Sequence, residues 1–206
     1  GFFIFYPTKN ITTIEGGMVI TNTKNVAKYV MTSRNHGLTK TLTQRYSHGK
    51  PWDYNVDESG YNYRLDEIRS ALGLSQIKRI KKINELIKRK FEYYNKKLKG
   101  VIHLITPTSS SNTDHAYHLY ILRVEKNNKV SRDELFNKLS KYGIRTSVHY
   151  KPLHMFTAFS KFKNNTNDLK NSEQVYDEII SLPFYPNMSK KQQDYVIHSI
   201  VKLMKT

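Results

Sequence analysis

Apolar residues recur at helical spacing through the middle of the chain, from about Leu65 to Lys97, and Gly100 follows as a stop signal. Lysines and arginines fill the positions between them, as expected for an amphipathic helix with a solvated basic face. A helix of this length is unusual in a globular protein, and we therefore expect it to bridge two substructures. Its apolar stripe consists of Ile77, Ile80, Ile83, Leu86, Ile87, Phe91, Tyr94 and Leu98.

Before this helix, the chain shows one strand pattern, one helix pattern and a long irregular stretch. Residues 16–21 (GGMVIT) predict a buried strand. Asn22 or Thr23 then offers a cap for a helix that runs to about Asn35. Residues 39–59 are polar and without periodicity, so we expect a long loop of the kind that is often functional.

Beyond the long helix the pattern changes to that of a small α+β unit. Two capping boxes mark helix starts, one from Ser131 to Glu134 and one from Ser189 to Gln192. Residues 161–171 are polar and predict a loop. The predicted strands cover 101–106, 117–124 and 144–150, and the predicted helices cover 131–143, 172–182 and 189–204.

Composition narrows the class of protein. The chain of 206 residues has no cysteine, which excludes a disulfide framework and thiolate zinc sites and is compatible with a cytosolic protein. It also lacks an apolar run of the roughly 18 residues that suggest a membrane span. We therefore expect no membrane association and a cytoplasmic location.

The formal net charge of +17 is large enough to raise a nucleic acid or another polyanion as a partner. Much of this charge lies on the long predicted helix, where a solvated face explains it without a ligand. No nucleic-acid-binding motif accompanies it. We therefore do not expect a nucleic-acid partner, and a basic nucleic-acid-binding module stays open only as an alternative function.

Lys9 has an unusual setting for a lysine. In the stretch FFIFYPTKNITTIEGGMVI it follows aromatic residues and a proline turn and precedes a double glycine. A lysine after a turn is ordinarily a surface residue. An amine among aromatic rings and close backbone is partly desolvated, however, which favours its use as a nucleophile toward a carbonyl group. The residues alone leave both interpretations open, and the second suits pyridoxal phosphate chemistry.

Several blocks of sequence, in their order and spacing, resemble the pyridoxal-phosphate-dependent sugar aminotransferases of the DegT/StrS type, which have fold type I. The blocks are YPTKNITTIEGGMVITN, RNHG, GYNYRLDEIRSALGLSQIKRI, AYHLYIL, GIRTSVHYKPLH, SLPFYP and QQDYVI. They are most similar to those of the nucleotide-sugar C4 aminotransferases that act on 4-keto-6-deoxy amino sugars. The resemblance covers almost the whole chain and corresponds to the C-terminal half of such an enzyme.

The resemblance implies an α/β fold in three parts. Residues 1–64 would be a remnant of the large cofactor-binding domain, residues 65–99 the long bridging helix, and residues 100–206 the small C-terminal α+β domain. It implies an enzyme that transfers an amino group, from glutamate, to a keto sugar nucleotide in surface polysaccharide biosynthesis. The cofactor would be pyridoxal 5'-phosphate, and the full-length enzyme a homodimer. A truncated or decayed copy without activity of its own is the alternative.

The resemblance also assigns roles to residues. Lys9 would be the catalytic lysine, which binds pyridoxal phosphate covalently and moves a proton between the substrate carbon and the cofactor. Asn62 would reach the cofactor phosphate in the partner's site across the dimer, although without its flanking motif a cap of the long helix would be the favoured interpretation. A His-Tyr pair is often a packed strand edge, but here the substrate-facing residues would be His149, Tyr150 and His154. No His, Asp or Glu cluster has the spacing of a metal site.

Two residues near Lys9 depart from the family's pattern. Ile4 stands where members usually carry a serine that holds the cofactor phosphate, and Ile14 stands where they usually carry a glycine. If that glycine position needs a positive φ angle, a β-branched side chain is strained there. The upstream part of the large domain, with the acidic residue that binds the pyridine nitrogen, has no counterpart in the chain. We therefore expect the chain alone to bind the cofactor poorly.

Overall fold

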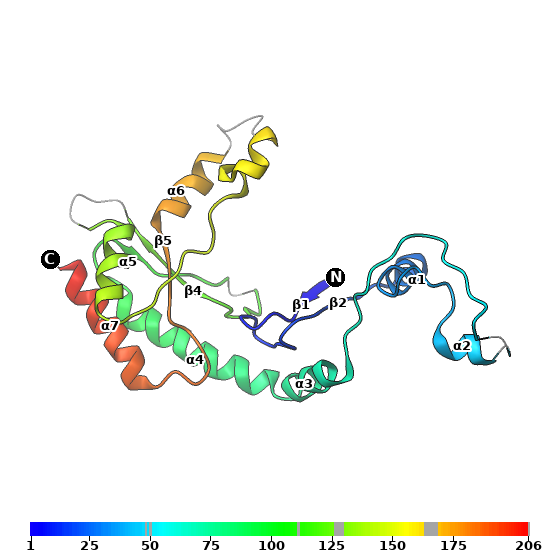
Figure 1. The fold of residues 1–206 in the computed structure, drawn as a ribbon. Coiled ribbons are helices and arrows are strands. Elements are labelled where there is room, and N and C mark those ends of the chain that lie inside the picture. The colour runs from blue at the N-terminus through cyan, green and yellow to red at the C-terminus, as the bar shows by residue number, and fades with distance from the viewer. Residues whose placement is uncertain (48, 50, 111, 126–129, 163–168, 206) are drawn as a thin grey trace. The chain divides into compact units, whose positions relative to one another are not determined.

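The computed structural model describes residues 1–47, 49, 51–110, 112–125, 130–162 and 169–205. The chain divides into two compact units, Gly1–Ile80 and Lys81–Thr206. Figure 1 labels helices and strands of both units. Within the described residues, no helix is both long enough and apolar enough to cross a membrane.

The first unit begins with an antiparallel pair of short strands, β1 (Phe2–Ile4) and β2 (Gly17–Val19). Phe2 lies opposite Val19, and Ile4 lies opposite Gly17. The strand predicted at 16–21 is thus confirmed over its central residues. It is not buried as predicted, because a two-stranded sheet buries a face only where another layer packs on it, and both strands are largely exposed.

Helix α1 (Lys24–Ser33) begins after Thr23, as predicted, and ends slightly earlier than predicted. The chain then turns at His36 and Gly37, whose φ angles are 61° and 75°. A side chain at Gly37 would place its Cβ 1.8 Å from the carbonyl oxygen of Glu58, so only glycine fits this turn.

The loop predicted at 39–59 is wrong over part of its length, because it contains the short helix α2 (Leu42–Ser47). Thr41 and Gln44 cap its start reciprocally. Gln44 donates its backbone N–H to Thr41 Oγ1 at 3.3 Å, and Thr41 donates its backbone N–H to Gln44 Oε1 at 2.9 Å. This arrangement is a capping box, and the polar composition of the stretch concealed it.

The single long helix predicted between Leu65 and Lys97 is also wrong, because the structure has two helices, α3 (Glu67–Ile77) and α4 (Ile80–Leu98). Between them, Arg79 donates its backbone N–H to Gln76 O at 2.9 Å. This three-residue spacing belongs to a 3₁₀ turn and not to an α-helix. The apolar stripe continues across the break, so the periodicity did not reveal it.

The second unit contains an antiparallel sheet in the order β3, β4, β5. The strands are β3 (Leu104–Ile105), β4 (Tyr120–Val124) and β5 (Ile179–Leu182). They confirm shorter parts of the strands predicted at 101–106 and 117–124. Both predicted capping boxes are present, at Ser131 and Ser189. The remaining elements are α5 (Arg132–Lys141), α6 (Lys170–Glu178), α7 (Lys190–Met204) and the 3₁₀ helices η1 (Leu153–Met155) and η2 (Thr157–Phe162).

Two predictions fail at the edge of this sheet. The stretch 144–150, predicted as a strand, forms only an isolated bridge between Ser147 and Ser181. The third strand is instead β5, which lies in the stretch 172–182 that the periodicity predicts as a helix. All of β5 is buried, and a short continuous apolar run cannot be assigned to helix or strand by periodicity alone. Of the loop predicted at 161–171, residues 163–168 lie outside the described residues.

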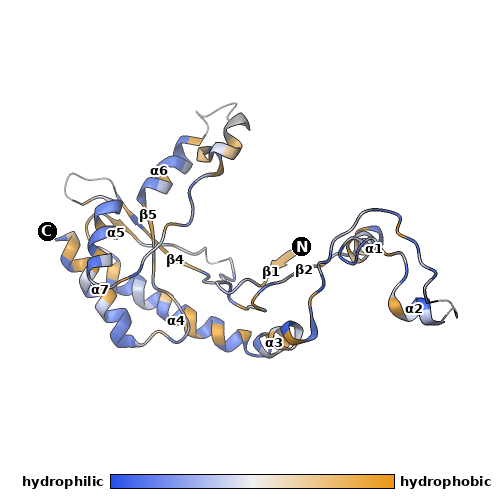
Figure 2. Cartoon of the chain, viewed as in Figure 1, coloured by the Kyte–Doolittle hydropathy of each residue, from blue (hydrophilic) through white to orange (hydrophobic). Residues whose placement is uncertain are grey.

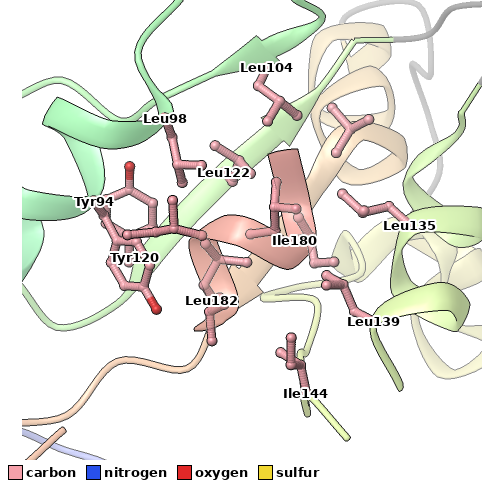
Figure 3. Packing of buried hydrophobic residues seen from close by; sticks show 14 of the residues in the cluster. Tyr94, Leu98, Leu104, Tyr120, Leu122, Leu135, Leu139, Ile144, Ile180 and Leu182 are labelled. Atoms are coloured by element: carbon pink, nitrogen blue, oxygen red, sulfur yellow. The ribbon is translucent and has the colours of Figure 1, made fainter. Parts of the chain in front are cut away.

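The core of the second unit combines apolar residues of the sheet with those of α4, α5 and α7, and Figure 3 shows part of it. The rings of Tyr94 and Tyr120 lie 4.7 Å apart between centroids. Their hydroxyls donate to Pro183 O at 3.0 Å and to Asn95 Oδ1 at 2.8 Å, so the buried phenols are satisfied. Burial raises the pKa of both tyrosines. Figure 2 shows polar and apolar residues side by side along α4, which confirms its predicted amphipathic character.

Candidate active site

Lys9 lies in the tight loop that connects β1 to β2. Phe5 donates its backbone N–H to Gly16 O, and Thr13 donates its backbone N–H to Phe5 O, each at 2.9 Å. Thr13 is buried, and a Cβ at Gly16 would lie 2.7 Å from Thr13 Oγ1. The loop therefore has no room for a larger residue at Gly16, and its backbone is held closely on both sides of Lys9.

The side chain of Lys9 is half-buried, and its backbone N–H donates to Tyr6 O at 3.0 Å across the turn. Among the residues that the structure describes, Lys9 Nζ has no hydrogen-bond or ion-pair partner. An amine that is not paired with an acid can react with a carbonyl group. These features suit the nucleophilic role that the sequence predicts.

The two departures from the family pattern differ in their consequences. Ile14 has a φ angle of 71°, so the strain considered for this position is present and costs about 1–2 kcal/mol. Its backbone N–H donates to Thr12 Oγ1 at 2.8 Å, which keeps the turn in place. Ile4 is exposed on β1 and offers only an apolar side chain where a phosphate donor would be needed.

Asn62 is exposed and forms an isolated β-bridge with Asn35. It does not cap the following helix, because Asp66 is the N-cap of α3. Arg64 Nη1 donates to Asn35 Oδ1 at 3.2 Å and so ties this segment to the end of α1. Among the described residues, no hydrogen bond joins Asn62 to Lys9, although both belong to the first unit.

The predicted substrate-facing residues lie in one segment of the second unit. His149 Nδ1 is 2.8 Å from Ser181 Oγ, and its ring packs edge-on against Tyr150 with centroids 4.7 Å apart. His154 Nε2 is 2.9 Å from Glu173 Oε1. The two histidines are thus engaged by β5 and α6, whereas Tyr150 is 69% exposed. Sequence reasoning missed Ser181 and Glu173, because neither lies near its histidine in the chain.

A second group of polar residues, also not predicted, lines a cavity of about 380 Å³ beside the sheet: His103, Arg123, Glu125, Gln174 and Glu178. Arg123 donates to Glu178 Oε2 from Nε at 3.0 Å and from Nη2 at 2.6 Å, and Gln174 donates to Glu178 Oε1 at 2.9 Å. Burial alone would raise the pKa of Glu178, but the hydrogen bonds from Gln174 and Arg123 and the charge of Arg123 lower it. Within the described residues, no group of three or more His, Asp or Glu is placed to hold a metal ion.

Comparison with known proteins identifies the family. A sequence profile of the DegT/DnrJ/EryC1/StrS aminotransferase family matches residues 1–201. The chain therefore belongs to this aminotransferase family, as its motifs predict.

Two relatives and one solved structure describe the similarity. The chain is 36% identical over 209 residues to the spore coat polysaccharide biosynthesis protein SpsC of Bacillus subtilis, a match that covers 98% of this chain and 53% of SpsC. It is 29% identical over 202 residues to the UDP-4-amino-4,6-dideoxy-N-acetyl-beta-L-altrosamine transaminase of Campylobacter jejuni, covering 98% and 51%. PseC of Helicobacter pylori, an aminotransferase involved in pseudoaminic acid biosynthesis, superimposes with a TM-score of 0.88 at 28% identity, covering 99% and 53%.

These comparisons confirm the predicted α/β class of fold, which is that of an aminotransferase. The chain spans about half the length of the curated relatives that it matches. The division into residues 1–64, 65–99 and 100–206 stays a prediction.

The residues around Lys9 fit one end of pyridoxal phosphate. The aldehyde end would need an amine without a partner on a fixed backbone, and Lys9 meets this requirement as far as the described residues go. The phosphate end needs hydrogen-bond donors, which the side chain of Ile4 does not offer. The amide of Asn62 is exposed, so it is available to a phosphate held by another chain. The described residues therefore fit part of the cofactor and not its phosphate end.

Proposed function

We propose that the chain is the C-terminal half of a pyridoxal-phosphate-dependent aminotransferase that transfers an amino group from glutamate to a keto sugar nucleotide in surface polysaccharide biosynthesis. The family match supports the reaction class. The names of SpsC and of the altrosamine transaminase support the substrate class and the pathway. The observation that carries the proposal is Lys9 itself, a half-buried residue on a closed loop whose Nζ has no hydrogen-bond or ion-pair partner among the described residues.

In this reaction Lys9 has two roles. Its Nζ would hold pyridoxal phosphate at the aldehyde end, and the same amine, when free, would carry a proton to or from the reacting carbon of the substrate. Pyridoxal phosphate, when bound, supplies the electron sink that stabilises the carbanion next to the transferred nitrogen. The closed backbone of the loop limits the positions that Nζ can reach, which favours transfer between two nearby carbons.

The other candidate residues bind and orient. Asn62 offers two amide N–H donors to the cofactor phosphate of a partner chain, so the full-length enzyme would be a homodimer with its sites at the interface. His149, Tyr150 and His154 form the segment that faces the sugar nucleotide. Phenol and imidazole groups can hydrogen-bond to sugar hydroxyls or diphosphate oxygens.

A second candidate is a copy that has no activity of its own. The half-length coverage of its relatives and the apolar side chain of Ile4 favour this alternative for the chain in isolation. The two candidates make different predictions for cofactor binding with and without the rest of the enzyme.

The test is covalent labelling with pyridoxal phosphate and borohydride, which makes the attachment of the cofactor to an amine permanent, followed by peptide mass spectrometry. The chain is used alone and joined behind the N-terminal part of SpsC. We expect labelling of Lys9 in the joined protein, loss of labelling in Lys9→Ala, and no change in the control Lys40→Ala. Labelling elsewhere that persists in Lys9→Ala would overturn the assignment. Labelling of Lys9 in the chain alone, at micromolar cofactor, would contradict the poor cofactor binding on which the second candidate rests.

A further inference from the structure

The segment 147–154, which contains the candidate substrate-facing residues, is attached near both of its ends to one continuous stretch of chain. This stretch runs from Glu173 in α6 to Ser181 in β5 without an intervening loop. Ser147 and Ser181 exchange backbone hydrogen bonds of 3.1 Å and 2.7 Å. The segment thus begins as an extension of the sheet, although it is too short to count as a strand.

Ser181 holds the segment a second time through its side chain. Its Oγ is 2.8 Å from His149 Nδ1, and the residue is only 4% exposed. A buried hydroxyl without a partner is costly, and in the described residues His149 is the side chain that satisfies it. The imidazole of His149 is therefore oriented by a residue that does not itself reach the surface.

Glu173 holds the other end. Its Oε1 lies 2.9 Å from His154 Nε2, and this hydrogen bond becomes an ion pair when the imidazole is protonated. The His154 side chain is 12% exposed, so little of it is left to contact a ligand. The contact joins α6 to η1, the 3₁₀ helix in which the segment ends.

The stretch that provides both contacts is itself anchored at the junction of α6 and β5. Arg132 is buried and donates from Nη1 to Tyr176 O at 2.8 Å and to Ile179 O at 3.0 Å, which satisfies carbonyl groups at the end of α6. The ion pair of Glu178 with Arg123 attaches the same junction to the central strand β4. Glu173 and Ser181 are therefore held in fixed positions relative to each other.

We propose that Ser181 and Glu173 are positioning residues, which hold His149 and His154 so that Tyr150 between them is presented at the surface to the sugar nucleotide. The part of this proposal that concerns the ligand rests on the proposed function. The histidines then act mainly as anchors, and Tyr150 becomes the principal contact residue of the segment.

The test uses the whole chain labelled with ¹⁵N and records the imidazole nitrogens of His149 and His154 by NMR. Ser181→Ala should shift the signals of His149 and leave those of His154 in place, and Glu173→Gln should do the reverse. Ser199→Ala removes a serine of similar burial, 5% exposed, in α7 and is the control for the first variant. Asp177→Asn changes an exposed acid of the same helix and is the control for the second. Neither control should move either histidine.

Binding is then measured by titration with UDP-N-acetylglucosamine as the probe. We expect signals of Tyr150 to move on titration and the dissociation constant to rise about 2- to 10-fold in each positioning variant, the effect of one lost hydrogen bond. Unchanged histidine signals in both Ser181→Ala and Glu173→Gln would overturn the proposal. So would unchanged affinity in both variants of a chain that binds the probe. If the unmodified chain does not bind the probe, the result contradicts the proposed sugar-nucleotide substrate. The histidine signals still decide whether Ser181 and Glu173 position the segment.

Discussion

Replacement of Glu178 by alanine tests how the second unit is held together. The Glu178 side chain is 8% exposed and accepts hydrogen bonds from Arg123 at 2.6 Å and 3.0 Å and from Gln174 at 2.9 Å. It lies at the last position of α6, directly before β5. Glu178→Ala removes the acceptor and leaves the guanidinium of Arg123 without its counter-ion.

The expected loss follows from the exposure of the two partners. Removing one member of a fully buried pair costs about 3–5 kcal/mol, because the other charge stays buried without compensation. The Arg123 side chain is 36% exposed, so water can solvate part of its guanidinium after the substitution. We therefore expect the free energy of unfolding of the second unit to fall by about 2–3 kcal/mol, near the lower limit for such pairs.

Amide hydrogen exchange in the ladder between β4 and β5 measures this loss directly. Fluorescence is unsuitable, because the one tryptophan, Trp52, belongs to the first unit. A loss of 2–3 kcal/mol corresponds to about 30- to 140-fold faster exchange of the most protected amides. Asp177→Ala, which removes an exposed acid from the last turn of α6, is the control and should change exchange little.

The same pair gives a pH dependence of known sign. Because the pKa of Glu178 is lowered in the folded state, its stabilising contribution is present above the pKa of an unfolded glutamate, about 4.3. The contribution is lost as the pH falls through the lowered pKa. The difference between the unmodified chain and Glu178→Ala should therefore shrink below about pH 4. Exchange rates within about 2-fold of each other at neutral pH would refute the reasoning, because they would show that the pair has no net effect.

Two further predictions concern the core and the surface. Leu122→Ala, at a fully buried position of the central strand, should lower the free energy of unfolding by about 2–5 kcal/mol, whereas Ile102→Ala at an exposed position should have little effect. Urea unfolding followed by circular dichroism compares the two variants, and equal midpoints would contradict the assigned core. The isolated chain should self-associate, because both strands of the first unit expose large apolar side chains, and replacing Phe2 and Ile4 by serine should reduce this association. Sizing chromatography measures the self-association, and a monodisperse monomer at all concentrations would show that these side chains do not mediate it.

Local sequence signals predicted the starts of several helices. The capping boxes at Ser131 and Ser189 are closed within four residues, so their hydrogen bonds depend on little outside the segment itself. The reciprocal cap of Thr41 and Gln44 is also a capping box, so the start of α2 could have been predicted in the same way. It was missed because the residues around it are polar and show no helical periodicity. The break between α3 and α4 is different, because the apolar spacing is the same on both sides of it.

A family motif in the sequence also predicted Lys9 as the catalytic residue. Lys9 and its neighbours belong to a continuous block, so the closed loop around the amine follows from residues that are adjacent in the chain. The partners of His149 and His154 could not be predicted this way. Ser181 is an ordinary serine in an apolar run, and its role exists only because β5 carries it beside His149.

The amino-acid sequence by itself therefore determined the aminotransferase family, the starts of the capped helices and the setting of Lys9, because each depends on residues close together in the chain. Only the tertiary structure decided that Ile179–Leu182 is a strand and that the strand predicted at 144–150 is not. It also decided that Ser181 and Glu173 hold the two histidines. The physical reason is that a buried apolar run suits a helix or a strand equally well, and backbone pairing with β4, distant in the chain, selects the strand.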